Sequence, residues 1–147
     1  MKRIITTTAI VVLVAVAALA QSASLNVSQA FARYGKAHGC TEIMVTGKKA
    51  RSIGLDRYHS LEAPAAYAAA IAAMVTRDGA TAADRETEYR GGQLYFGFYK
   101  LRRAAGANRY VFYLNQALAR TRKADRVTLI YMEGPATKEQ VRKLISQ

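Results

Sequence analysis

Cysteine and histidine are the residue types here best suited to nucleophilic or metal chemistry, and the chain has few of them. Cys40 is the single cysteine, it follows His38 closely, and His59 lies further along the chain. A thiolate becomes a useful nucleophile beside a base or a metal, so Cys40 with His38 or His59 is a candidate dyad. A zinc site needs three or four protein ligands, and the sequence has no CxxC or HExxH motif to supply them. The alternative is that Cys40 is a small buried residue before a strand, and we expect no metal site.

The acidic residues form no recognisable catalytic pair. Their spacing does not place two carboxylates across a cleft, and neither a phosphate loop nor a dinucleotide fingerprint occurs. The sequence therefore predicts no catalytic residues and no cofactor. The acids considered are Asp78, Asp84, Glu86, Glu88 and Asp125 in turns or at a strand edge, with Glu42 and Glu133 in or near strands.

Basic residues dominate the charge, with 22 Lys and Arg against 10 Asp and Glu. They are densest between Lys100 and Arg126, where Asp125 is the one acid. A balance this basic favours a polyanionic or acidic partner. The densest positions fall in two predicted loops, 101–108 and 115–125, which would lie at opposite ends of a strand, about 20 Å apart. The candidate binding residues are Arg102, Arg103, Arg120, Arg122 and Lys123. The alternative is a solvated basic surface.

The first twenty residues have the three-part layout of a secretory signal peptide. Lys2 and Arg3 form a basic start, an uncharged apolar stretch follows, and Ala18-Leu19-Ala20 offers a small-x-small cleavage site. The dense apolar run is shorter than the roughly 20 residues that span a bilayer. This favours removal over an uncleaved membrane anchor.

We therefore expect a signal peptide over 1–20 and a single domain over 21–147. Loss of the two basic residues of the signal peptide would leave a charge of +10. The cleavage site has no cysteine, so the expected protein is periplasmic or secreted, is not a lipoprotein and has no membrane span after cleavage. Nucleic acid is not the expected partner of an exported protein.

Helix signals occur near the start, in the middle and at the end of this domain. Ser28 can cap a first helix that Gly39 ends, and Pro64 begins a second that stops at Gly79. A capping box over residues 137–140 opens a third helix. The apolar stripe of the second helix consists of Tyr67, Ile71, Met74 and Val75, and that of the third of Val141, Leu144 and Ile145.

Strand patterns fill most of the remaining sequence, and residues 50–56 fit no pattern. We predict strands over 41–46, 57–61, 85–90, 93–100, 109–114 and 126–132. Gly91-Gly92 is typical of a two-residue hairpin turn. The predicted fold is α+β, with a mostly antiparallel sheet of about five to six strands and N-terminal, middle and C-terminal helices packed on it. Because the last three strands are apolar on both sides, both sheet faces must be covered.

Alternation along residues 93–100 predicts which side chains share a face. Leu94, Phe96 and Phe98 are expected on one face, and Tyr95 and Tyr99 on the other.

The tyrosines at 95, 99 and 113 allow two interpretations. They could form an exposed aromatic platform for a partner, or the alanine-rich helix over 64–76 could cover them. We favour the covered arrangement.

Several strand and turn segments together resemble a family of small exported proteins from Bacteroidetes-type bacteria, a domain family of unknown function. The segments are Leu25–Val27, Arg57–Leu61, Phe98–Leu101, Asn108–Phe112 and Val127–Gly134. The resemblance implies a cell-envelope or secreted location and supplies no activity or catalytic residue. This chain departs from the family in its high alanine and arginine content.

The expected function is that of a non-catalytic, exported binding module that uses its basic loops to hold an anionic envelope polymer or a protein partner. The alternative function is an envelope enzyme using Cys40 with His38 or His59. A third hypothesis is a structural subunit that pairs through a sheet edge near 85–90, where Arg85 and Glu86 are weak guards.

Overall fold

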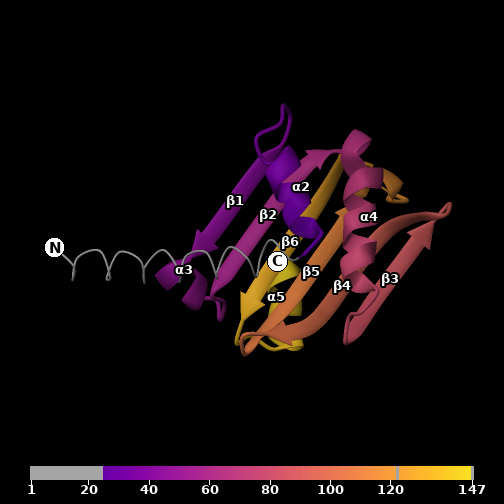
Figure 1. Ribbon diagram of the computed structural model, residues 1–147. Coiled ribbons are helices and arrows are strands. Elements are labelled where there is room, and N and C mark those ends of the chain that lie inside the picture. The colour runs from indigo at the N-terminus through magenta and orange to yellow at the C-terminus, as the bar shows by residue number, and fades with distance from the viewer. Residues whose placement is uncertain (1–24, 122, 147) are drawn as a thin grey trace, which may run out of the picture.

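A six-stranded antiparallel sheet in the order β1-β2-β6-β5-β4-β3 forms the centre of the fold (Figure 1). The computed structural model describes residues 25–121 and 123–146, so the predicted signal peptide and Arg122 lie outside the described residues. The strands are β1 (Thr41–Thr46), β2 (Arg57–Pro64), β3 (Asp84–Arg90), β4 (Gln93–Ala104), β5 (Ala107–Asn115) and β6 (Arg126–Gly134). The helices are α2 (Val27–Tyr34), α3 (Gly47–Arg51), α4 (Ala68–Gly79) and α5 (Lys138–Ile145), with short 3₁₀ turns at Ala65–Tyr67 and Gln116–Leu118. The predicted fold class is confirmed.

Pairing between β2 and β6 joins two separate hairpin systems into one sheet. β1 and β2 form the first, linked through α3, and β3 to β6 form a continuous meander. β1 and β3 are therefore the two edges. None of the described helices is long and apolar enough to cross a membrane.

Helices cover both faces of the sheet, as the apolar strands require. α2 and α4 lie on one face and α5 on the other (Figure 1). Tyr99 and Tyr113 are buried in the core beneath α4, and the Tyr113 hydroxyl donates to the carbonyl of Ala68 at 3.3 Å. The covered arrangement is therefore confirmed for these two tyrosines. Tyr95 is half-buried, and the Arg90 guanidinium lies 3.5 Å above the centre of its ring.

A β-bulge makes the predicted face of Leu94 wrong. Tyr89 pairs with Leu94 and Glu88 with Phe96, so Tyr95 is an extra residue in β4. An extra residue shifts the alternation of side chains by one position. Leu94 consequently packs in the α4-side core, while Phe96 packs on the α5 side.

The first predicted helix differs from the structure at both ends. Asn26 and not Ser28 stands at the N-cap of α2, and the helix ends at Tyr34, well before Gly39.

Two further predicted boundaries also differ from the structure. β2 continues to Pro64, and a 3₁₀ turn precedes α4, so the helix begins four residues later than predicted. The predicted loop 101–108 is a tight turn at Ala105 and Gly106, both with positive φ. Such a turn matches the twist of paired strands and lets them extend further. The unassigned residues near 50 belong to α3 and the turn after it.

Ion pairs connect the edge strand β3 to α5. Lys138 contacts Asp84 and lies 3.2 Å from Glu86, which also pairs with Arg142. Hydrogen bonds from Arg142 and Lys138 lower the pKa of Glu86. The predicted edge near 85–90 is thus a strand edge of charged residues, the kind that resists pairing with another sheet.

The buried tyrosines predict a loss of stability in alkali. Burial raises the pKa of both Tyr99 and Tyr113 from 10.0 to about 12. Between these pH values an unfolded tyrosine ionises while its folded counterpart stays neutral, so unfolding releases protons. We expect the contribution of these tyrosines to stability to be constant below pH 10 and to fall as pH rises towards 12. Denaturant titrations over this range should show the fall, and Tyr99→Phe should make it shallower. An unchanged slope would contradict the assignment.

Candidate functional site

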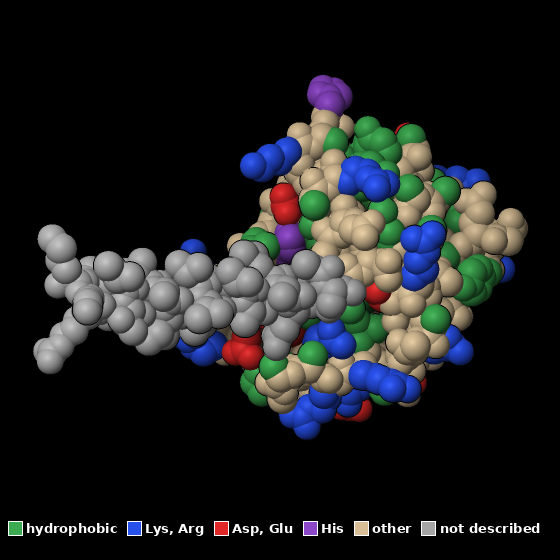
Figure 2. Space-filling model, in the orientation of Figure 1, with side chains coloured by type: hydrophobic (Ala, Val, Ile, Leu, Met, Phe, Trp, Pro, Cys, Tyr) green, Lys and Arg blue, Asp and Glu red, His purple; other side chains and the backbone are tan. Residues whose placement is uncertain are grey.

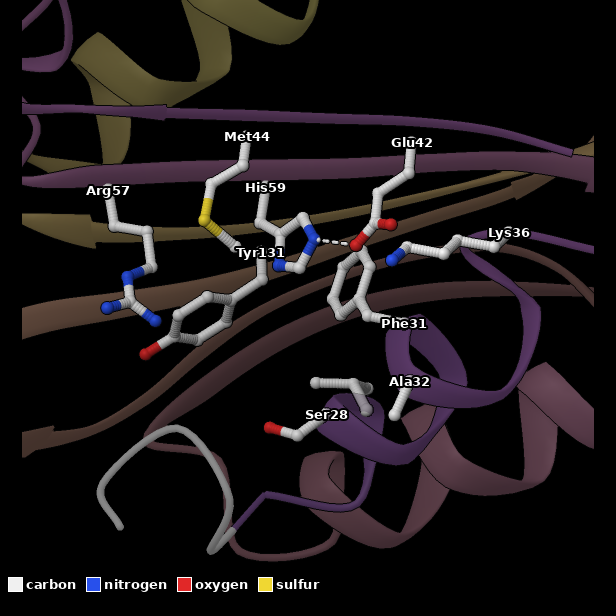
Figure 3. A pocket seen from close by; sticks show the side chains of 10 residues that line it. Ser28, Phe31, Ala32, Lys36, Glu42, Met44, Arg57, His59 and Tyr131 are labelled. Carbon is white, nitrogen blue, oxygen red and sulfur yellow. Dashed lines mark hydrogen bonds and ion pairs between the residues drawn. The ribbon is translucent and has the colours of Figure 1, made fainter. Parts of the chain in front are cut away.

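A pocket of about 510 Å³ lies between α2 and the sheet, beside the edge strand β1 (Figure 3). We call it the α2–β1 pocket. Its walls are mostly apolar, with a few polar groups that converge on the space, which is the usual composition of a small-molecule site. The lining residues are Val27, Ser28, Phe31, Ala32 and Lys36 from α2 and its end, Glu42 and Met44 from β1, Arg57 and His59 from β2, and Tyr131 from β6.

An imidazole–carboxylate pair forms the centre of the pocket floor. His59 Nε2 lies 2.6 Å from Glu42 Oε1, and the Phe31 ring stacks on the imidazole with centroids 3.7 Å apart. His59 is buried. The contacts fix the ring from two sides, so the imidazole presents its other nitrogen, Nδ1, in a defined direction.

Gly35 permits this pair to form. A Cβ atom at position 35 would lie 2.2 Å from Glu42 Oε2 and 2.6 Å from the carbonyl oxygen of Phe31. The Glu42 carboxylate therefore occupies space that any larger residue at the end of α2 would fill.

Three charged residues occupy paired positions on the neighbouring strands β2, β6 and β5 beside the pocket. Arg57 of β2 and Arg109 of β5 are both cross-strand neighbours of Glu133 in β6. The Glu133 carboxylate accepts from the Tyr131 hydroxyl at 2.7 Å and lies 3.8 Å from the Arg57 guanidinium. Burial, reinforced by Glu133, raises the pKa of Tyr131 far above its ordinary value. The Tyr131 phenol is therefore a neutral hydrogen-bonding group at neutral pH.

The pocket carries cations at both ends and an exposed apolar side chain at its rim. Figure 3 shows Arg57 at one end and Lys36 at the other, directed towards the Glu42 side. Met44 is 53% exposed, which is high for a methionine. An apolar rim between two cations suits a ligand with an apolar body and an acidic group.

The structure brings His59 together with Glu42 and does not bring it to Cys40. His59 pairs across the strands with Met44, four residues beyond Cys40, a distance of about 13 Å along a strand. Cys40 packs at the edge of the α2–α4 core and does not line the pocket, and His38 is exposed in the turn after α2. Across residues 25–121 and 123–146, no three His, Cys, Asp or Glu side chains gather as metal ligands would.

The predicted basic residues lie in two separate places. Arg102 and Arg103 are exposed residues of β4, next to the tight turn, and not residues of a loop. Arg120 and Lys123 are exposed in the connection after β5, and Arg122 lies outside the described residues. These two groups lie at opposite ends of β5, as predicted, so the four described residues do not form one surface.

Sequence analysis identified His59 as a candidate site residue but did not identify its partners, Glu42 and Phe31. Alternation alone places Glu42 and Met44 on one face of their strand. No sequence signal gave the register that sets Met44 opposite His59, or the helix that brings Phe31 over it.

The fold and this pocket define a small α+β domain with a ligand-type cavity on one sheet face. The chain belongs to the Family of unknown function (DUF6108), whose pattern it matches over residues 13–145. The resemblance seen in the sequence is confirmed as far as membership of an uncharacterised family. No curated protein and no solved structure matches the chain.

Proposed function

We propose that this is an exported, non-catalytic binding protein that holds an amphipathic, acidic ligand in the α2–β1 pocket. The observation that carries the proposal is the pocket itself. Its volume and its mostly apolar lining with a few polar groups are typical of a small-molecule site. The signal-peptide layout of residues 1–20, and the resemblance to exported proteins of Bacteroidetes-type bacteria, support a periplasmic or secreted location.

Seven of the ten lining residues have a role in binding the ligand. Met44, Phe31 and Val27 contact the apolar body, while Arg57 or Lys36 pairs with the acidic group. His59, held by Glu42, offers Nδ1 as a fixed hydrogen-bonding atom. Because Cys40 lies outside the pocket, the arrangement favours orienting a ligand over nucleophilic attack.

The net positive charge of the chain supports a second role at the cell envelope, the electrostatic binding of an anionic partner. The five predicted residues, Arg102, Arg103, Arg120, Arg122 and Lys123, are candidates for holding an anionic polymer or a protein partner. Since the four of them that the structure describes form two groups, such a partner would be bound at one end of β5 or would span both ends.

Filling the α2–β1 pocket should abolish ligand binding. We use dodecanoate as the probe, because it has an apolar chain and one carboxylate. Ala32→Trp places an indole at the pocket wall, and Arg57→Gln removes a charged donor, which should weaken binding about tenfold. Isothermal titration calorimetry of the full chain measures both effects.

The matched control is Ala66→Trp, because Ala66 is also an exposed alanine but does not line the pocket. It should bind dodecanoate as the unmodified protein does. Equal affinity in the Ala32→Trp and Ala66→Trp variants, or no saturable binding by the unmodified protein, would refute the proposal.

A further inference from the structure

Three arginine residues line a second cavity, together with Leu25 and Asn26 just before α2. This cavity has a volume of about 330 Å³, and we call it the arginine recess. Arg77 comes from the last turn of α4, Arg102 from β4 and Arg109 from β5. Figure 2 shows Lys and Arg side chains gathered along the lower edge of this face, around the β4–β5 turn. The remaining lining residues are Leu25, Asn26, Asp78, Thr81 and Leu101.

The described lining of the recess carries a net positive charge, because three arginines stand against the single carboxylate of Asp78. Within residues 25–121 and 123–146, none of the three guanidinium groups forms an ion pair with a carboxylate. Arg109 donates from Nε to the backbone carbonyl of Arg102 at 2.9 Å. That bond fixes the direction of the Arg109 side chain and leaves both its terminal nitrogens for a ligand.

Asp78, the acid among the lining residues, already accepts three hydrogen bonds. Its carboxylate accepts from the backbone and side-chain nitrogens of Asn26 and from the backbone nitrogen of Val27, each at 2.8 Å. At the end of α4, the Gly79 carbonyl accepts from the backbone nitrogen of Ala82 at 3.1 Å and from Arg85 at 3.4 Å. Asp78 and the Gly79 carbonyl therefore already have hydrogen-bond donors, whereas within the described residues no carboxylate pairs with Arg77, Arg102 or Arg109.

We propose that the arginine recess binds a tetrahedral oxyanion, the phosphate or sulfate group of a larger molecule. A guanidinium donates two parallel hydrogen bonds to such a group, and three arginines from three elements can surround it. The inference rests on the electrostatic role proposed above and narrows it to one site. Of the basic residues predicted from the sequence, Arg102 lines this recess, while Arg103, Arg120 and Lys123 do not.

Titration of the full chain with inorganic phosphate, and separately with inorganic sulfate, tests the proposal. Arg102→Gln and Arg77→Gln should each weaken binding about tenfold, since a hydrogen bond to a charged group is lost. Arg103→Gln is the matched control, because Arg103 is the adjacent exposed arginine and donates to the carbonyl of Gly106 outside the recess. It should change affinity less than twofold, roughly the effect of one screened surface charge. All three substituted residues are exposed, and unchanged thermal unfolding confirms that the variants fold.

Two further binding assays identify the kind of molecule that carries the phosphate or sulfate group. Retention on phosphatidylglycerol vesicles, compared with phosphatidylcholine vesicles, reports a lipid phosphate, and retention on heparin reports a sulfated glycan. Arg102-dependent retention in either assay supports the proposal. Equal losses for Arg102→Gln and Arg103→Gln in every assay, or no phosphate or sulfate binding, would overturn it. Ala32→Trp in the α2–β1 pocket should leave phosphate affinity unchanged, so failure of either proposal is distinguishable from failure of the other.

Discussion

Asp78→Ala should lower the free energy of unfolding by about 3 kcal/mol and should also detach α2 from α4. Asp78 is buried at the end of α4, and its carboxylate is the acceptor for the backbone nitrogens of Asn26 and Val27. Each buried donor left without an acceptor costs about 1–3 kcal/mol. Chemical denaturation monitored by circular dichroism measures the loss.

The substitution should also disturb the α2–β1 pocket. Val27 and Phe31 line this pocket and belong to α2, the helix whose first backbone nitrogens Asp78 binds. Dodecanoate affinity should therefore fall in Asp78→Ala under conditions where the variant is still folded. Asp125→Ala is the control, since Asp125 is an exposed acid and should change stability by less than about 0.5 kcal/mol. A loss below about 1 kcal/mol for Asp78→Ala would show that water replaces the carboxylate.

Asp78 also shows why the sequence revealed the elements of this fold more readily than its site. Periodicity and turn residues predicted the strands, the middle and C-terminal helices and the fold class, because these signals are local. The partners of Asp78 lie 51 and 52 residues away, and an aspartate near a helix end is equally compatible with a turn. Long-range hydrogen bonds leave no local pattern.

The same limit applies to His59 and Glu42, which are 17 residues apart. Their contact depends on the β1–β2 register and on Gly35, which leaves space for the carboxylate. It also applies to Leu94, because a bulge at Tyr95 cannot be inferred from alternation. The sequence therefore specified which residues are available for a site, whereas register and close packing decide which of them meet.

Gly79→Ala should destabilise the protein by about 2 kcal/mol, although alanine is the better helix former. Gly79 is the last residue of α4, and a Cβ there would lie 2.3 Å from Cε1 of the buried Tyr99 ring. The same ring also packs closely over Gly97, where a Cβ would lie 2.6 Å from its Cε2, so the ring lies between two glycines. Overpacking a core in this way costs about 1–3 kcal/mol. The role of Gly79 is thus to let α4 approach the sheet as well as to end the helix.

A double-mutant cycle separates this clash from the effect of helix propensity. In a Tyr99→Ala background the ring is absent, so Gly79→Ala should become neutral or stabilising by up to about 1 kcal/mol, the difference in propensity between alanine and glycine. Denaturation of the four proteins gives the coupling energy. If Gly79→Ala costs the same in both backgrounds, the Tyr99 ring is not the source of the cost. A coupling of about 2–3 kcal/mol would instead show that the contact of Gly79 with the Tyr99 ring sets the spacing between α4 and the sheet, the spacing on which the burial of Tyr113 also depends.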